Sequence, residues 1–315
     1  MSDTRSTPII IDNGSCFIKA GSADRYQPAC VIPAVIGRSK ADGSKVNSTI
    51  YMGAEALNKR DVLELSRPVS SSFGAGPTAV STRWDDVAAL WRHIFTHELG
   101  VGSEDKSVLM LVGSSTARAP LEKIAQILFE EFLVSEFCIA SQSHAALYLS
   151  GKKTGCVVDV GYNEAVITQI YEGQMLLAST KTMSYSDKKQ VDSFPASLFS
   201  ALGAQDVSLQ QAAHDGIMKC DVEIRKTLLS NVVLSGGNSV FDGMDLRLAT
   251  ELKKLAPAAE VKVASSPQRE FSSWLGAAKM TALPSFENRW VSRQDYDESG
   301  PAVVHRLSPL DFMVL

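Results

Sequence analysis

The stretch Ile9-Ile10-Ile11-Asp12-Asn13-Gly14-Ser15-Cys16-Phe17-Ile18-Lys19-Ala20-Gly21 consists of an apolar run, a short polar turn and a second apolar run. This pattern predicts a strand, a tight turn and a second strand, with the polar residues at one edge of a sheet. Such a turn presents a carboxylate, a hydroxyl and backbone N–H groups together, and oriented N–H groups suit a phosphate chain. The stretch is therefore a candidate phosphate-binding hairpin.

The same pattern returns once, in a less regular form, at Cys156-Val157-Val158-Asp159-Val160-Gly161-Tyr162-Asn163-Glu164-Ala165-Val166-Ile167. Again an apolar strand ends in an aspartate, a glycine lies in the turn, and an apolar strand follows. Two related hairpins on facing sheets could grip a nucleotide between them. The rest of the sequence bears on whether this chain binds a nucleotide there.

The composition is that of an ordinary globular protein, because 45% of the 315 residues are hydrophobic and 21% are charged. A chain of this length favours two domains. The net charge of -4 gives no electrostatic reason to expect nucleic acid. No apolar run reaches the ~18 residues of a membrane span, and the first residues lack a signal peptide's apolar region. The five cysteines show no CxxC spacing, and several lie inside apolar strands or helices, where they are expected to be small core residues of a protein in a reducing compartment.

Strands alternate with amphipathic helices along most of the chain, which predicts an α/β fold with sheets covered on both faces. Between Met183 and Val207 this regular pattern is lost. The helices expected outside this interval start at Trp84 and Pro120, span Gln142–Leu149, Gln210–Ser230 and Met244–Leu255, and run from Pro267 to Leu283.

Two histidines on the helix after Trp84, His93 and His97, are four residues apart and could form a metal-binding pair. Ile94 follows His93, however, so the HExxH motif is excluded, and no third ligand stands out. Structural histidines are the favoured interpretation, and no metal site is expected.

Several segments resemble actin, in the same order along nearly the whole chain. The resemblance implies the actin/Hsp70/hexokinase-like (ribonuclease H-like) fold, with two α/β domains around a nucleotide cleft. The segments are Ile11–Ser15 with Lys19–Gly21, Trp84–Asp86, Ile170–Gly173, Ile217–Val222, Val233–Gly237 and Gln294–Pro301.

On this resemblance, residues 1–149 plus 272–315 form the outer domain, with the small second subdomain at about 33–68. Residues 150–271 form the inner domain. The helical fourth subdomain of actin shrinks to a remnant at about 184–207, so it is largely deleted. The resemblance therefore implies a shortened actin with three subdomains.

Seven residues keep the actin pattern of the nucleotide cleft. Ser15 and Lys19 match phosphate-binding residues, and Gln142 matches the residue that helps to position the attacking water. The other four lie in the second hairpin and in the turn beside the nucleotide: Asp159, Gly161, Gly236 and Gly237. Glycine and aspartate are also common in sharp turns that bind nothing, so this cleft is a vestigial site in the present interpretation.

Four substitutions depart from the actin pattern in the same cleft. Cys16 replaces a turn glycine, and Tyr162 replaces an acidic residue that organises magnesium. Val166 replaces the histidine that helps to activate water, so proton handling is lost. Glu270 stands where actin has a lysine beside the base. We expect no catalytic residue, no ATP hydrolysis and no resident cofactor, with weakly bound ATP or ADP as the open alternative.

The resulting hypothesis is a non-catalytic, actin-like structural subunit of a larger cytoskeletal or ciliary protein assembly. Its expected location is the cytoplasm and cytoskeleton, or the axoneme of a cilium or flagellum. Its expected partners are other proteins of that complex, not nucleic acid or membrane, and without the fourth subdomain ordinary homopolymerisation should fail. The loop Ser70–Thr82 and the tail Leu307–Leu315 are candidate contacts for a partner. The alternative for the loop is a surface insertion that binds nothing, and the alternative for the tail is packing against its own chain.

Two other hypotheses remain. One is an ATP-binding actin-related protein that polymerises or serves in a motor or chromatin-remodelling complex. The other is a sugar-kinase-like enzyme on the same fold, for which no sugar-binding constellation is visible in the sequence.

Overall fold

In the computed structural model, the described residues are 6–39, 49–69, 83–184, 197–200 and 207–307. The loop Ser70–Thr82, most of the interval 184–207 and the tail after Leu307 lie outside these residues. Contacts divide the chain into two compact units. The first unit runs to Val112 and also contains Thr116–Ile139 and the segment from Arg289, and the second contains Gly113–Ser115 and Ala140–Asn288.

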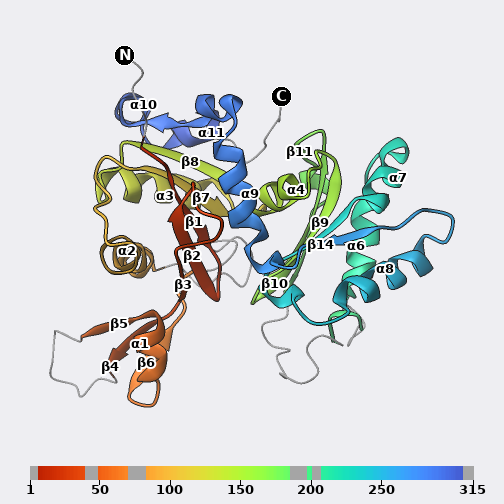
Figure 1. Ribbon diagram of the computed structural model, residues 1–315, viewed down its shortest axis with the longest axis horizontal. Coiled ribbons are helices and arrows are strands. Elements are labelled where there is room, and N and C mark those ends of the chain that lie inside the picture. Colours follow the sequence, from red (N-terminus) through yellow and green to blue (C-terminus); the bar gives the residue numbers. More distant parts are fainter. Residues whose placement is uncertain (1–5, 40–48, 70–82, 185–196, 201–206, 308–315) are drawn as a thin grey trace. The chain divides into compact units, whose positions relative to one another are not determined.

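The candidate phosphate-binding hairpin lies in the main sheet of the first unit (Figure 1). The first two strands pair antiparallel, as predicted, so that Asp12 lies opposite Lys19. The first strand also pairs with β7 in parallel, which makes the sheet mixed. The described strands follow the order β15 (Val291–Ser292), β8 (Glu136–Ser141), β7 (Ser107–Val112), β1 (Ile9–Asn13), β2 (Phe17–Ser22) and β3 (Cys30–Pro33).

The helices of the first unit bury the apolar faces that the sequence predicts. Trp91 and Phe95, for example, are fully buried. Arg293 ties the last helical segment to the core, because it donates hydrogen bonds to the carbonyl oxygens of Phe129 and Val134. These elements are α2 (Trp84–His93), the π-helix η1 (Ile94–Glu98), α3 (Arg118–Glu130), α10 (Arg293–Ser299), η7 (Pro301–Val303) and α11 (Val304–Leu307).

A small separate sheet forms between β3 and α2, at the place expected for the second subdomain. Its strands follow the order β5 (Ile50–Met52), β4 (Ile36–Ser39) and β6 (Leu63–Ser66), and α1 (Gly53–Asn58) packs on it. Figure 1 shows this group beyond the end of β3. Arg38 on β4 forms a two-pronged ion pair with the buried carboxylate of Asp86 on α2. This ion pair links the small sheet to the body of its unit.

The second candidate hairpin belongs to the main sheet of the second unit. Its strands β9 (Gly155–Val160) and β10 (Glu164–Tyr171) pair antiparallel, whereas β13 pairs in parallel with β9 and β14, so this sheet is also mixed. The remaining strands are β11 (Gln174–Met175), β12 (Lys181–Ser184), β13 (Val232–Ser235) and β14 (Val263–Ser265).

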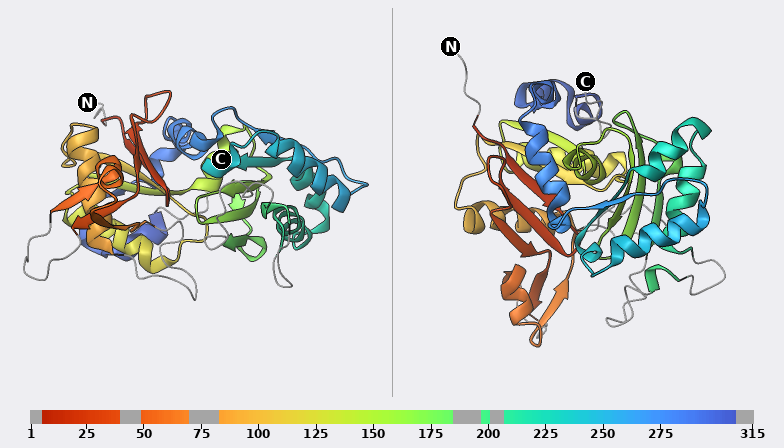
Figure 2. Two further views of the ribbon diagram at one scale, coloured as in Figure 1. Left: turned by 90° about the horizontal axis from the view of Figure 1, so that it is seen from below. Right: turned by 45° about the vertical axis from the view of Figure 1, so that its right-hand side comes forward.

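Successive side chains of β9 point to opposite faces of the sheet, and both faces are apolar, which explains why helices cover both of them. Cys156 and Val158 pack in one core cluster with residues of α6, α7 and α8, whereas Val157 packs in another with Ala146 and Leu147 of α4. Figure 2 shows these helices around the sheet. The helices are α4 (Gln142–Leu149), α6 (Leu209–Met218), α7 (Val222–Ser230), α8 (Met244–Leu255) and α9 (Ser272–Thr281), with short turns η2 (Leu177–Ser179), η4 (Gly237–Ser239), η5 (Arg269–Phe271) and η6 (Pro284–Arg289).

Helices α4 and α9 pack against each other at very short range. A Cβ atom added to Gly276 would lie closer than 3.0 Å to the carbonyl group of Ala145, so only glycine fits there. Because α4 also packs on β9 and β13, contacts place both helices in the second unit. The sequence-based division, with boundaries at 149/150 and 271/272, instead assigned them to the outer domain.

Three helix predictions differ from the structure. The segment Gln210–Ser230 forms two helices, because Asp221 is extended, with ψ of 141°, between α6 and α7. The helix predicted to open at Pro120 begins at Arg118, since the first four N–H groups of a helix need no intrahelical acceptor and a proline is tolerated in the first turn. The helix expected from Pro267 is preceded by the turn η5 and starts at Ser272.

All five cysteines are free thiols, and Cys138, Cys156 and Cys220 are buried as expected. Burial raises the pKa of the Cys156 thiol to about 12, so this thiol stays protonated in the core. Among the described residues, no helix is both long and apolar enough to cross a bilayer.

Candidate functional site

The turn of the first hairpin is shaped by close backbone approach. A Cβ atom at Gly14 would lie closer than 3.0 Å to the carbonyl oxygen of Phe17, so this position needs glycine. Ser15 follows it and is buried, with 5% of its surface exposed. The next residue, Cys16, is half-buried, and its carbonyl oxygen accepts a hydrogen bond from the N–H of Ala34 at 2.8 Å. Backbone contacts therefore hold the turn. The residue directly after Ser15 is Cys16, so a thiol side chain stands at this position of the turn.

Lys19 lies across the hairpin from Asp12, and its ammonium group is 2.9 Å from the Asp12 carboxylate. The Asp12 side chain is only 2% exposed, and that of Lys19 is 15% exposed. The lysine that matches a phosphate-binding residue is therefore already paired with a buried carboxylate. Asn13 has a structural role beside it, because it accepts a hydrogen bond from the indole N–H of Trp91 at 3.0 Å.

The second hairpin contacts the Gly236–Gly237 turn within the second unit. A Cβ atom at Gly236 would lie closer than 3.0 Å to a carboxylate oxygen of Asp159, and Gly236 has a φ of 95°, which disfavours other residues. Asn238 donates a hydrogen bond of 2.8 Å to the carbonyl oxygen of Gly161. Asp159, Gly161 and Gly236 are thus brought together, and Gly237 adjoins them with open space around its α-carbon.

Val166 lies directly opposite Asp159 on the neighbouring strand β10, and Thr182 of β12 lies opposite Val166. Residues paired in this way project from the same face of a sheet. Val166 is 7% exposed. The position beside Asp159 therefore carries an isopropyl group, which can neither accept nor donate a proton.

Gln142 is the first residue of α4 and lies beside a row of buried hydroxyl groups. Ser114 donates to Ser143 at 2.8 Å, and Ser143 donates to Thr168 at 3.2 Å. Ser114 also contacts Ser141 at 2.8 Å, and since a serine hydroxyl has one hydrogen, Ser141 must be the donor there. Ser141 accepts from the backbone N–H of His144, which caps α4. The hydrogen bonds of this hydroxyl row all run in one direction and hold the start of the Gln142 helix.

Replacing Ser114 by alanine should destabilise the protein by about 1–3 kcal/mol, because Ser141 loses its acceptor and Ser143 its donor in a buried site. Urea unfolding followed by circular dichroism measures this change. The matched control is Thr250→Ala, which removes an exposed hydroxyl–carbonyl hydrogen bond and should cost less than about 0.5 kcal/mol. Equal effects of the two substitutions would contradict the prediction.

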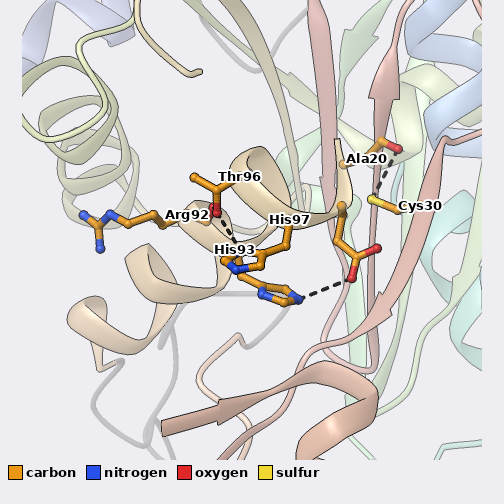
Figure 3. Close-up of polar contacts among 7 residues, drawn as sticks. Ala20, Cys30, Arg92, His93, Thr96 and His97 are labelled. Carbon is orange, nitrogen blue, oxygen red and sulfur yellow. Dashed lines mark hydrogen bonds and ion pairs between the residues drawn. The ribbon is translucent and has the colours of Figure 1, made fainter. Parts of the chain in front are cut away.

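The two histidines of the candidate metal pair contact each other and neighbouring polar side chains. His93 and His97 stack with their ring centroids 4.9 Å apart, and His93 pairs with Glu98 at 3.3 Å (Figure 3). The hydroxyl of Thr96 lies 2.7 Å from His97. No group of three or more histidine, cysteine, aspartate or glutamate side chains in the described ranges is arranged to hold a metal ion.

Cys30, also drawn in Figure 3, has a pKa raised to about 11, mainly by burial and further by the charge of Glu98. Because the thiolate is the nucleophile, we expect slow alkylation of Cys30 by iodoacetamide near neutral pH, with the rate rising about tenfold per pH unit until the pKa is approached. Glu98→Gln should lower the pKa and accelerate the reaction. Peptide mass spectrometry measures the Cys30 adduct, and an unchanged rate in this variant would contradict the role of Glu98.

The sequence-predicted site residues divide between the units, with Ser15 and Lys19 in the first and the other five in the second. Sequence reasoning missed the Asn238 contact to the second hairpin and the hydroxyl row. A signal was present for the row, since Ser141 and Ser143 flank Gln142 in an otherwise apolar segment.

One comparison with known protein families bears on this geometry. The family model described as Actin matches residues 3–201 and 200–309 of the chain. The two matched segments meet inside the interval 184–207, where the sequence places the shortened fourth subdomain. The two mixed α/β sheets and the paired hairpins agree with this match. The chain therefore belongs to the actin family, and it is shorter than a typical actin.

Proposed function

We propose that this chain is a non-catalytic, actin-like structural subunit of a larger cytoskeletal or ciliary protein assembly. In this proposal the two hairpins serve as scaffold, no cofactor is resident, and ATP is not hydrolysed. The proposed cellular location, in the cytoplasm, cytoskeleton or axoneme, and the proposed protein partners rest on family analogy. A fold by itself does not determine function. The net charge of -4 supports a protein partner over nucleic acid.

The observation that carries the proposal is Val166, buried opposite Asp159. General base catalysis requires a group that accepts a proton within hydrogen-bonding reach of the attacking water. An isopropyl group cannot do so, and loss of a positioned polar group in an active site typically costs about 10²–10³ in rate.

Two measurements on the purified full chain test the proposal. Denaturation followed by chromatography should release far less than one adenine nucleotide per chain. Phosphate release from magnesium ATP should equal that of Asp159→Asn, a variant that keeps the size of the side chain beside Gly236. Stoichiometric nucleotide, or hydrolysis that the substitution abolishes, would contradict the proposal.

The second candidate is an ATP-binding actin-related protein that polymerises or serves in a motor or chromatin-remodelling complex. The retained geometry of Asp159, Gly161 and Gly236 favours it. Sedimentation in magnesium and potassium salt separates the two candidates, because a polymerising protein pellets above a critical concentration. A subunit that lacks half of a repeating head-to-tail contact stays in the supernatant.

A further inference from the structure

The last strand of the second unit's sheet has one edge that pairs with no described strand. The described strands of this sheet follow the order β11, β10, β9, β13 and β14, so β14 has β13 on one side only. Strand β13 also lies between β14 and the hairpin of β9 and β10. The free edge of β14 therefore faces away from the second hairpin, which contains Asp159 and Gly161.

The backbone of this strand places hydrogen-bonding groups on the free edge. Lys262, just before β14, donates its N–H to the carbonyl oxygen of Leu229 at 3.1 Å and accepts from the N–H of Val232 at 3.0 Å, both on the β13 side. Successive residues direct their backbone groups to alternate edges of a sheet, so Val263 and Ser265 direct theirs to the free edge. Beyond the strand ladders, no backbone hydrogen bond among the described residues involves either of them. Such an edge is a template for pairing with another chain.

The two faces beside this edge differ in chemistry. Val261 and Val263 pack against the core cluster formed with α6, α7 and α8, whereas Ala264 packs against the cluster that contains residues of α4. Because side chains alternate along a strand, Lys262 lies on the same face as Ala264. An added strand would therefore meet valine side chains on one face and a lysine on the other.

The face that carries Lys262 has an excess of positive charge. Burial, and next the charge of Lys262, lower the pKa of the Lys152 ammonium group, so the two lysines lie near each other. Glu260 pairs with Lys262 at 2.8 Å, but both side chains are more than 60% exposed, and pairs of this kind contribute little. Two ammonium groups against one carboxylate favour a segment that brings further carboxylates to this face.

We propose that the free edge of β14 binds an extended segment of a protein partner as an additional antiparallel strand. Its apolar side chains would lie over Val261 and Val263, and its carboxylates beside Lys262 and Lys152. Backbone hydrogen bonds supply affinity in this mode of binding, and alternate side chains supply specificity. The inference rests on the proposed structural function and specifies the chemistry of the partner, an alternation of apolar and acidic residues.

Fluorescence anisotropy of the full chain with a labelled peptide of alternating valine and glutamate tests the charge preference. We expect saturable binding that weakens at least about tenfold when lysine replaces glutamate in the peptide, and also in the double variant Lys152→Gln, Lys262→Gln. The matched control is Lys59→Gln with Lys123→Gln, which removes two lysines of the first unit and should bind as the wild type does. No saturable binding, or equal binding by both double variants, would overturn the proposal.

Methylated peptides test the backbone pairing. Residues directly opposite each other in an antiparallel pair project to the same face, so the valines of the peptide would exchange hydrogen bonds with Val263 and Ser265. Methylation of the valine nitrogens should therefore abolish binding, whereas methylation of the glutamate nitrogens, which point away from β14, should leave it within about twofold. Equal binding of the two methylated peptides would contradict strand addition.

Amide hydrogen exchange, measured at single residues by NMR, supplies a readout on the chain itself. In the free chain the amide of Val263 should exchange faster than that of Ala264, and the peptide should slow Val263 at least about tenfold. Protection of Val263 before the peptide is added would show that the edge is already covered and would overturn the inference. None of these measurements involves nucleotide, so a chain that released stoichiometric ATP would refute the proposed function without affecting the result at this edge.

Discussion

Substituting Gly276 by alanine should destabilise the protein by at least about 3 kcal/mol or prevent it from folding. The added methyl group would stand closer than 3.0 Å to the carbonyl oxygen and carbon of Ala145, and a helix backbone cannot yield as a flexible side chain can. Helices α4 and α9 would have to separate, and α4 packs on strands β9 and β13 of the second unit. Chemical denaturation followed by circular dichroism measures the loss.

The matched control for this substitution is Gly102→Ala in the first unit. An added Cβ atom there would meet no atom within 4 Å, so its effect should lie within about 0.5 kcal/mol of zero. If both variants unfolded at the same denaturant concentration, the close approach of α4 and α9 would not be a feature of the protein in solution.

Arg38→Ala should destabilise the first unit by about 3 kcal/mol, at the lower end of values for breaking a buried ion pair because 29% of the Arg38 side chain is exposed. The substitution leaves Asp86, with a side chain only 5% exposed, as a buried carboxylate without its cation. The pair also joins β4 to α2, so amide hydrogen exchange should accelerate throughout the small sheet of β4, β5 and β6.

Glu55→Gln is the control, because it breaks the ion pair to Lys59, in which both side chains are largely exposed, and leaves the contact between Lys59 and Tyr51 in place. Exposed pairs contribute little, so the change should be below about 0.5 kcal/mol. The exchange of the small sheet should then remain close to that of the wild type. Comparable destabilisation by both substitutions would show that the burial of Asp86 does not matter.

Local patterns predicted much of the fold. The repeat of three isoleucines, a polar turn and a second apolar run predicted β1 and β2, and the apolar spacing of α8 predicted Met244–Leu255 to the residue. These elements follow from neighbouring residues alone. The break between α6 and α7 was missed because Asp221 lies within a continuous helical spacing of apolar residues.

Several contacts that hold the fold and the candidate site were beyond sequence reasoning because they join distant residues. Arg38 and Asp86 are 48 positions apart, and Asn238 reaches Gly161 over 77 positions. The need for glycine at 276 likewise depends on another helix. Such pairings depend on how the chain folds back on itself, which composition and spacing do not encode.

The hydroxyl row beside Gln142 has an electrical polarity, because Ser141, Ser114 and Ser143 each donate a hydrogen atom in the direction of Thr168. Reversing it would require the rotors to turn in concert, since a single reversed hydroxyl leaves two oxygens facing each other without a proton between them. The row therefore couples the orientation of the hydroxyl group accepted by Thr168 on β10 to that of Ser141, the residue that caps α4.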